Sequence, residues 1–146
     1  MRTEGSIINF SQLIEHESWD GLSLTIFYMS LYSLTPHPLS SENLASRRYE
    51  DRIIIGDVTL MEYADLLKEI DSASLTPVEE ESRMDARIYY VFENKYGETF
   101  EVAMWGRNDS MFVNGNQVEE ESIFYDVIMP FLPENIAEEL QAFVMR

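Results

Sequence analysis

The chain has 146 residues, of which 45% are hydrophobic and 25% are charged. It carries 27 Asp and Glu against 10 Lys and Arg, giving a formal net charge of −17, and it has no cysteine. This apolar content excludes a disordered acidic tail, the negative field excludes ordinary nucleic-acid and anionic-membrane binding, and the missing cysteines exclude disulfides and thiolate metal sites.

The length predicts one domain over residues 1–146, with enough apolar side chains for its own core. The first residues, Met1–Gly5, are not followed by an apolar run, so no secretory signal is expected. The strongest apolar stretch, Leu22–Leu34, is interrupted by Ser and Thr and is too short to span a bilayer. These features predict a cytoplasmic protein without a membrane anchor.

The first third of the chain predicts one short helix and two strands. Ser11–Glu17 is expected to be helical. Leu22–Tyr32 alternates in the manner of a strand and stops before Pro36-His37-Pro38, because proline cannot donate to a β-ladder. A second, short and buried strand is predicted at Arg52–Ile55, ended by Gly56-Asp57.

The clearest helix start in the sequence follows this second strand. Thr59 and Glu62 have the spacing of a capping box, in which the two side chains satisfy the first free amides of a helix. Apolar residues then recur at helical spacing: Leu60, Tyr63, Ala64, Leu67 and Ile70. The pattern predicts an amphipathic helix over 59–70.

The second half predicts a meander of strands followed by two helices. The strands are expected at 87–93, 99–105, 111–113 and 116–119, and Asn114-Gly115 favours a tight hairpin turn. Helices are predicted at 120–129, ending at Pro130, and at 134–145, beginning behind Pro133. The fold class is therefore α+β: an antiparallel sheet of about five strands with a C-terminal strand meander, packed on one face by three to four helices.

The sequence gives no positive indication of catalysis, a metal or a cofactor. The two histidines, His16 and His37, lie in no motif with convergent zinc ligands or a nucleophile. Carboxylates are so numerous that acid pairs arise by chance and indicate nothing. We therefore expect a non-enzymatic protein that binds neither metal nor cofactor.

Two acidic runs flank the predicted meander, and its strands present a mixed aromatic and charged face. If helices cover one face, Tyr89, Glu101 and Trp105 lie on the other, which has the composition of an interface: aromatic anchors inside a charged rim. Alternatively, Trp105 folds over the sheet edge into the core, and the second acidic run is helix N-terminal charge. The predicted partner-binding residues are Glu79, Glu80, Glu81, Tyr89, Glu101, Trp105, Glu119, Glu120 and Glu121.

The leading hypothesis is a non-catalytic module, monomeric or homodimeric, that neutralises a basic protein such as a toxin nuclease. Its small size and acidic, cysteine-free composition are similar to those of bacterial immunity proteins. An acidic surface attracts a cationic active site. Two alternatives are a small-molecule-binding or enzymatic domain with a pocket between sheet and helices, and a structural subunit that self-associates through its exposed sheet face.

Overall fold

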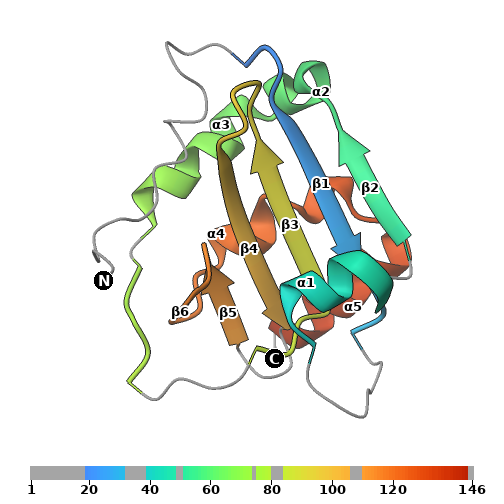
Figure 1. Ribbon diagram of the computed structural model, residues 1–146, viewed down its shortest axis with the longest axis vertical. Helices are drawn as coiled ribbons and strands as arrows, with labels where there is room; N and C mark the ends of the chain where they lie inside the picture. Colours follow the sequence, from blue (N-terminus) through green and yellow to red (C-terminus); the bar gives the residue numbers. More distant parts are fainter. Residues whose placement is uncertain are drawn as a thin grey trace.

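A six-stranded antiparallel sheet forms the centre of the protein (Figure 1). The structure is a computed structural model that describes residues 19–31, 39–48, 51–73, 75–79, 84–105 and 110–144. The predicted helix over 11–17, both histidines, Glu80 and Glu81 lie outside these ranges. The strands are β1 (Ser23–Tyr28), β2 (Asp51–Ile55), β3 (Ile88–Glu93), β4 (Thr99–Trp105), β5 (Ser110–Val113) and β6 (Asn116–Val118), in the spatial order β2-β1-β3-β4-β5-β6.

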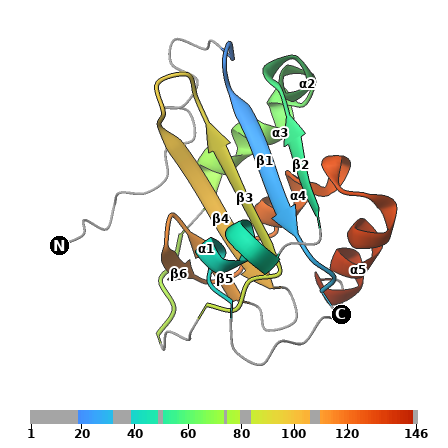
Figure 2. The same cartoon turned by 45° about the vertical axis from the view of Figure 1, so that its right-hand side comes forward.

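Short helices flank the sheet on both sides. They are α1 (Ser41–Asn43), which continues as the π-helical turn η3 (Leu44–Arg48), then α2 (Asp57–Glu62), α3 (Ala64–Lys68), the 3₁₀ turn η4 (Glu69–Ser72), α4 (Ile123–Asp126), the 3₁₀ turn η6 (Met129–Phe131) and α5 (Glu134–Val144). Figures 1 and 2 show α1 on one side of the sheet and α4 and α5 on the other. Within the described ranges no helix has the length and apolarity needed to cross a membrane.

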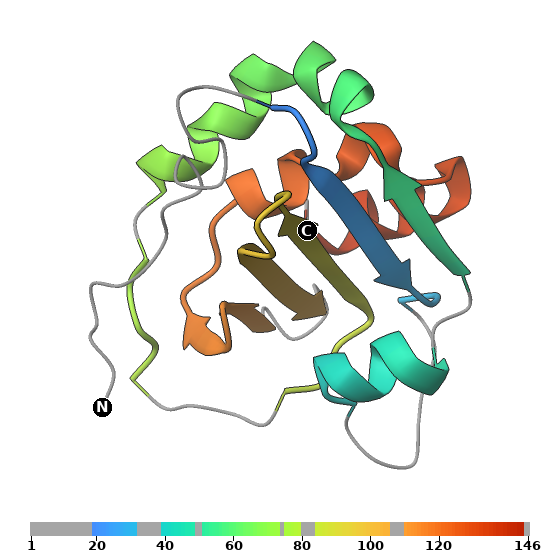
Figure 3. The ribbon, with the colours of Figure 1, turned by 45° about the horizontal axis from the view of Figure 1, so that its top comes forward.

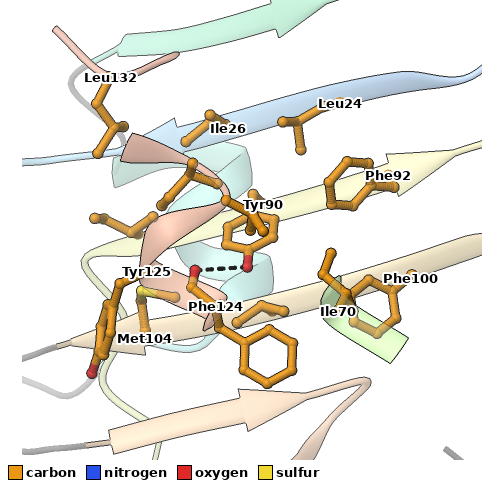
Figure 4. Packing of buried hydrophobic residues seen from close by; sticks show 14 of the residues in the cluster. Leu24, Ile26, Ile70, Tyr90, Phe92, Phe100, Met104, Phe124, Tyr125 and Leu132 are labelled. Carbon is orange, nitrogen blue, oxygen red and sulfur yellow. Dashed lines mark hydrogen bonds between the residues drawn. The ribbon is translucent and has the colours of Figure 1, made fainter. Parts of the chain in front are cut away.

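The face of the sheet that packs against α2–α5, here called the main face, carries the larger core. Tyr90, Phe92 and Phe100 lie on this face of β3 and β4. The Phe100 ring lies 6.3 Å from that of Phe124 of α4, and the Tyr90 hydroxyl donates to the Phe124 carbonyl over 2.8 Å (Figure 4). These aromatic side chains are buried and fill the layer between sheet and helices. These side chains occupy the space between sheet and helices in which the alternative hypothesis places a pocket.

The opposite face, here called the α1 face, carries a second and smaller core. Leu44 of η3 packs with Ala103 and Phe112, while Phe27 and Tyr89 lie against the same cluster with their rings stacked 5.9 Å apart. Side chains alternate between the two faces because successive residues of a strand point in opposite directions. The structure thus confirms the α+β class with an antiparallel sheet: its six strands correspond to the six predicted strand segments, and a helical cover lies on part of the second face.

The meander forms as its sequence pattern predicts. β3 pairs with β4, β4 with β5, and β5 with β6, all antiparallel. Asn114 and Gly115 form the β5–β6 turn with φ angles of 50° and 86°, which is the left-handed region such a turn requires. This hairpin prediction is confirmed.

The predicted capping box at Thr59 is wrong. The helix begins two residues earlier, at Asp57, with Gly56 as its N-cap and no side-chain capping bond, and the Leu60 N–H donates to the Gly56 carbonyl over 3.1 Å. Thr59 is therefore inside the first turn. The helix begins at Asp57 because the chain leaves β2 through an extended Gly56 and turns directly into the helix. The helix is also interrupted at Tyr63, where φ is −112° and ψ is 24°.

Two other predicted elements are shorter in the structure. β1 ends at Tyr28, before the predicted end of the strand at Tyr32. The predicted helix over 120–129 is reduced to α4 and to a 3₁₀ turn around Pro130. The shortening of β1 accompanies tertiary contacts: beyond the strand, the Leu31 N–H and the Ser30 hydroxyl donate to Glu139 of α5 over 2.7 and 3.0 Å. These bonds hold the end of β1 against α5.

Candidate functional site

Tyr89 and Glu101 are brought together on the α1 face. They lie on neighbouring strands, β3 and β4, with Tyr89 paired to Ala103 and Glu101 paired to Val91. The Tyr89 hydroxyl donates to Glu101 Oε1 over 2.5 Å. Both side chains are half-buried. The pair lies at the border of the sheet area that α1 covers. The sequence alternation placed both residues on one face, and the register makes them partners.

A small hollow opens beside this pair, and we call it the Tyr89 hollow. Its volume is about 30 Å³, which is room for one or two groups of the size of water. The lining residues are Ser41, Met84, Tyr89, Glu101, Ala103, Phe112 and Gly115. Glu101 supplies the only formal charge among them, so the hollow combines apolar walls with one carboxylate.

The backbone of Glu101 is fixed by the β5–β6 turn. Its N–H donates to Asn114 Oδ1 and its carbonyl accepts from the Asn114 N–H, each over 2.9 Å. Gly115 of the same turn reaches the wall of the hollow. The hairpin therefore holds the Glu101 backbone and the Tyr89 hydroxyl holds its carboxylate, which lowers the entropy cost of presenting that carboxylate to a ligand.

The Tyr89 phenol acts here as a hydrogen-bond donor. Burial, followed by the hydrogen bond from Tyr89 to Glu101 and the negative charges of Glu101 and Glu42, raises the pKa of Tyr89 above its ordinary value of 10.0. With its pKa raised, the phenol stays protonated at neutral pH, so it does not supply a phenolate as nucleophile or base. Glu101, in turn, keeps acceptor capacity, since a carboxylate has about four lone-pair sites and the phenol occupies one. The arrangement suits recognition of a cationic donor.

Raising the pH should reveal this environment. The folded-state pKa of Tyr89 lies above the unfolded value, so its contribution to stability is fully present below pH 10 and is lost as the pH rises toward the folded value. We expect the Tyr89→Phe variant to lose less stability than the wild type between pH 10 and pH 11, with slopes differing by up to about 1.4 kcal/mol per pH unit. Urea unfolding followed by tryptophan fluorescence measures both slopes. Equal slopes would contradict the assignment.

Trp105 is not on an open surface, and its predicted exposure is wrong. The side chain is 5% exposed and packs with the main core, and its Nε1–H donates to the Leu31 carbonyl over 2.9 Å. The Arg87 guanidinium lies 4.1 Å from the centre of the indole ring and is itself buried, donating to Asp85 Oδ1 and to the Ala86 carbonyl. The indole therefore offers almost no surface to a partner. The alternative, that Trp105 folds into the core, holds.

The chain segments that lead into Glu79 and Glu119 meet at the β6 edge of the sheet. Pro77 forms an isolated antiparallel bridge with Val118, and the Glu119 N–H donates to the Thr76 carbonyl over 2.7 Å. Glu79 and Glu119 are both exposed, and each lies within two residues of this bridge. The structure thus brings the segment before Glu79 beside Glu119, a contact that sequence spacing alone does not predict.

Glu120 and Glu121 stand apart from Glu119 in what they contact. The Glu120 carboxylate accepts from the hydroxyl of the buried Tyr125, and the Glu121 carbonyl accepts from the Phe124 N–H over 3.2 Å. Both residues therefore help to hold the start of α4. A charge substitution at Glu119 tests the surface more cleanly than one at Glu120.

Cations are few on the described surface. Arg52, Lys68 and Lys95 are the exposed ones among the described side chains, while exposed carboxylates occur on α1, β2, α2, α3, β3 and α5. Between described side chains two ion pairs form, Arg87–Asp85 over 2.6 Å and Lys95–Asp20 over 3.5 Å. In the same residues no group of three or more His, Asp or Glu is arranged to hold a metal ion.

Comparison of the chain with protein-family models, with curated proteins and with solved structures finds no match.

Proposed function

We propose that the protein is a non-catalytic binding module that docks a basic protein, in the manner of an inhibitor or immunity protein. The observation that carries the proposal is the Tyr89 hollow: a fixed carboxylate, hydrogen-bonded by a phenol and enclosed by apolar side chains, on a protein with a formal net charge of −17. A field of this sign speeds the approach of a cationic partner. The Tyr89 hollow would then provide a specific contact between the protein and this partner.

The size of the hollow indicates which cationic group fits. Room for one or two water-sized groups suits the ammonium of a lysine, which is a compact charge with three donors, better than a planar guanidinium. Met84, Ala103 and Phe112 would contact the methylene groups of the same side chain. Glu79 and Glu119, on the β6 edge, would extend the negative surface and steer association.

A capture experiment with charge-matched variants tests this proposal. The wild type, Glu101→Lys and Glu138→Lys are immobilised, exposed at low salt to lysate of the source cells and eluted with a salt gradient, and the proteins are identified by mass spectrometry. Glu138 is an exposed carboxylate on α5, so its substitution changes the net charge equally, on the side of the sheet opposite the hollow. We expect wild type and Glu138→Lys to retain one basic protein in stoichiometric amount, and Glu101→Lys to lose most of it.

Three outcomes separate the possible explanations. Equal losses in the two variants would mean that overall charge, and not the hollow, holds the partner. Retention by Glu101→Lys at the wild-type level would exclude the hollow as the contact. No retained basic protein at any salt concentration would contradict the proposed function itself. With a partner in hand, Glu119→Lys should slow association without lowering the melting temperature.

A further inference from the structure

Large apolar side chains are exposed in one short stretch of the chain. Of the four that stand out among the described residues, three lie between positions 54 and 61: Ile54 on β2 is 63% exposed, and Val58 and Met61 on α2 are 72% and 52% exposed. The fourth, Tyr96, lies in the β3–β4 turn and is 65% exposed. Scattered apolar exposure is normal, whereas a concentration of it marks an interaction surface. β2 and α2 meet at one corner of the sheet, here called the β2–α2 corner (Figure 3).

The corner includes β2, the outermost described strand on its side of the sheet. Among the described strands β2 pairs with β1 alone. The Met29 N–H donates to the Arg87 carbonyl, so odd-numbered residues of β1 point their amides toward β3 and even-numbered residues toward β2. The Arg52 N–H correspondingly points outward, where it donates to Asp51 Oδ1 over 2.8 Å.

The same alternation turns the amide and carbonyl groups of Ile54 outward. Gly56 is extended, with φ of −88° and ψ of 176°, so the strand geometry continues one residue past β2 to the start of α2. Asp51 closes only the Arg52 end of this edge. Ile54 therefore presents an N–H and a carbonyl, and Gly56 presents an N–H, in register for another extended chain, while the Gly56 carbonyl already accepts from the Leu60 N–H.

The charge around this edge indicates what kind of chain can bind there. Asp51, Glu62 and Asp65 are exposed carboxylates close in sequence to the three apolar residues, and Arg52 is the one exposed cation in the stretch from 51 to 65. An open hollow of about 310 Å³ lies at the junction of α2 and α3, lined by residues 61–66, among them Met61, Glu62 and Asp65. A segment with positive charges is complementary to this surface, and a second copy of this acidic chain is not.

The corner is also continuous with the Tyr89 hollow. Strand pairing aligns Ile54, Thr25, Val91 and Glu101 in one row across the α1 face. Three strand spacings, about 14 Å, separate the two ends of the row. A single protein partner is large enough to cover both.

We propose that the β2–α2 corner docks an extended cationic segment of a protein partner, which adds to the edge of β2. Its backbone bonds to Ile54 and Gly56, its apolar side chains cover Ile54 and Val58, and its Lys or Arg side chains reach the carboxylates of Asp51 and Glu62. Main-chain bonds supply affinity and alternate side chains supply specificity in this mode of recognition. The inference rests on the proposed function for the identity of the partner, but the corner itself is tested with a synthetic probe.

The probe is a short capped peptide of alternating Lys and Val, titrated into the isotope-labelled full chain and followed by amide NMR spectra. We expect the largest shifts at Ile54, Gly56 and Val58. The same peptide with N-methyl groups on alternate residues cannot donate to the edge and should bind about tenfold more weakly. A peptide of alternating Glu and Val should not bind.

Matched variants locate the contact. Ile54→Thr and Val58→Ser remove exposed apolar surface and should weaken the Lys-Val peptide about fivefold to tenfold, with unchanged melting temperatures. Tyr96→Ser removes a side chain of similar exposure at the other turn and should bind as the wild type does.

Four results would each overturn the proposal for the β2–α2 corner. They are absence of binding, shifts spread over all carboxylates, shifts confined to Glu101 and Glu119, and equal affinity for the N-methylated peptide. None of these outcomes bears on whether a basic protein is retained in the capture experiment, and failure there would leave a positive peptide result intact. The peptide experiment and the capture experiment thus distinguish a wrong proposal for the corner from a wrong proposed function.

Discussion

The Trp105→Ala variant should lose about 3–5 kcal/mol of unfolding free energy, because a large side chain is removed from a core that cannot fully close around the gap. Trp105 is 5% exposed and contacts both the core and the Arg87 guanidinium. The truncation also leaves the Leu31 carbonyl without the indole N–H. In a chain of this length the melting temperature should fall by roughly 10–15 °C. Urea unfolding and differential scanning calorimetry measure the two quantities.

The Trp105→Phe variant separates the two contributions of the indole. It keeps an aromatic ring beneath Arg87 but removes the N–H, so the expected loss is about 1–2 kcal/mol from the hydrogen bond together with a smaller loss of packing. If Trp105→Ala unfolded at the temperature of the wild type and instead lost its partner in the capture experiment, Trp105 would be an interface residue, as its place on an alternating strand first suggested.

The Arg87→Ala variant should lose about 3 kcal/mol. Arg87 is 1% exposed and its guanidinium is paired with Asp85 at 2.6 Å. Removing one member of a buried ion pair leaves the other charge without compensation, which typically costs about 3–5 kcal/mol. We expect the lower end of that range, because Asp85 is 22% exposed and also accepts from the Leu39 N–H. Chemical unfolding at neutral pH provides the measurement.

A double-mutant cycle tests whether the Arg87–Trp105 stack is one unit. The guanidinium lies 4.1 Å from the ring centre, so each single substitution removes the same contact and the double variant should lose about 1 kcal/mol less than the sum of the two. Strict additivity would show that the two side chains stabilise the fold independently. Lys95 and Tyr96, an exposed cation–π pair at 5.7 Å, provide the comparison pair and should show a smaller coupling energy.

Local sequence predicted the meander well because its signals are short-range. The alternation along 99–105 and the Asn114-Gly115 turn depend on neighbouring residues alone, and β4 has the predicted bounds. The helix over 59–70 was predicted less accurately. Its apolar spacing correctly identified Leu60 and Leu67 as buried, but the start at Asp57 and the interruption at Tyr63 depend on how the chain leaves β2 and packs on the main core.

The candidate site, too, was predicted in part from the sequence, while its contacts depend on the tertiary structure. Alternation was sufficient to place Tyr89 and Glu101 on one face, but their contact depends on the β3–β4 register and on α1 lying above them. The exposed group Ile54, Val58 and Met61 was missed, because an Ile-rich run predicts a buried strand. The edge position of β2, which the sequence pattern does not give, leaves Ile54 uncovered.

The sequence by itself determined the acidic charge, the strand alternation, the hairpin turn and the C-terminal amphipathic helix, since each is a property of composition or of residues a few positions apart. The tertiary structure alone decided that Trp105 and Arg87 are buried together, that residues 76 and 77 lie beside Val118 and Glu119 at the β6 edge, and that β2 is the outermost described strand on its side of the sheet. Those outcomes depend on which strands pair and which helix covers which face, and such long-range contacts leave no periodic trace in the sequence.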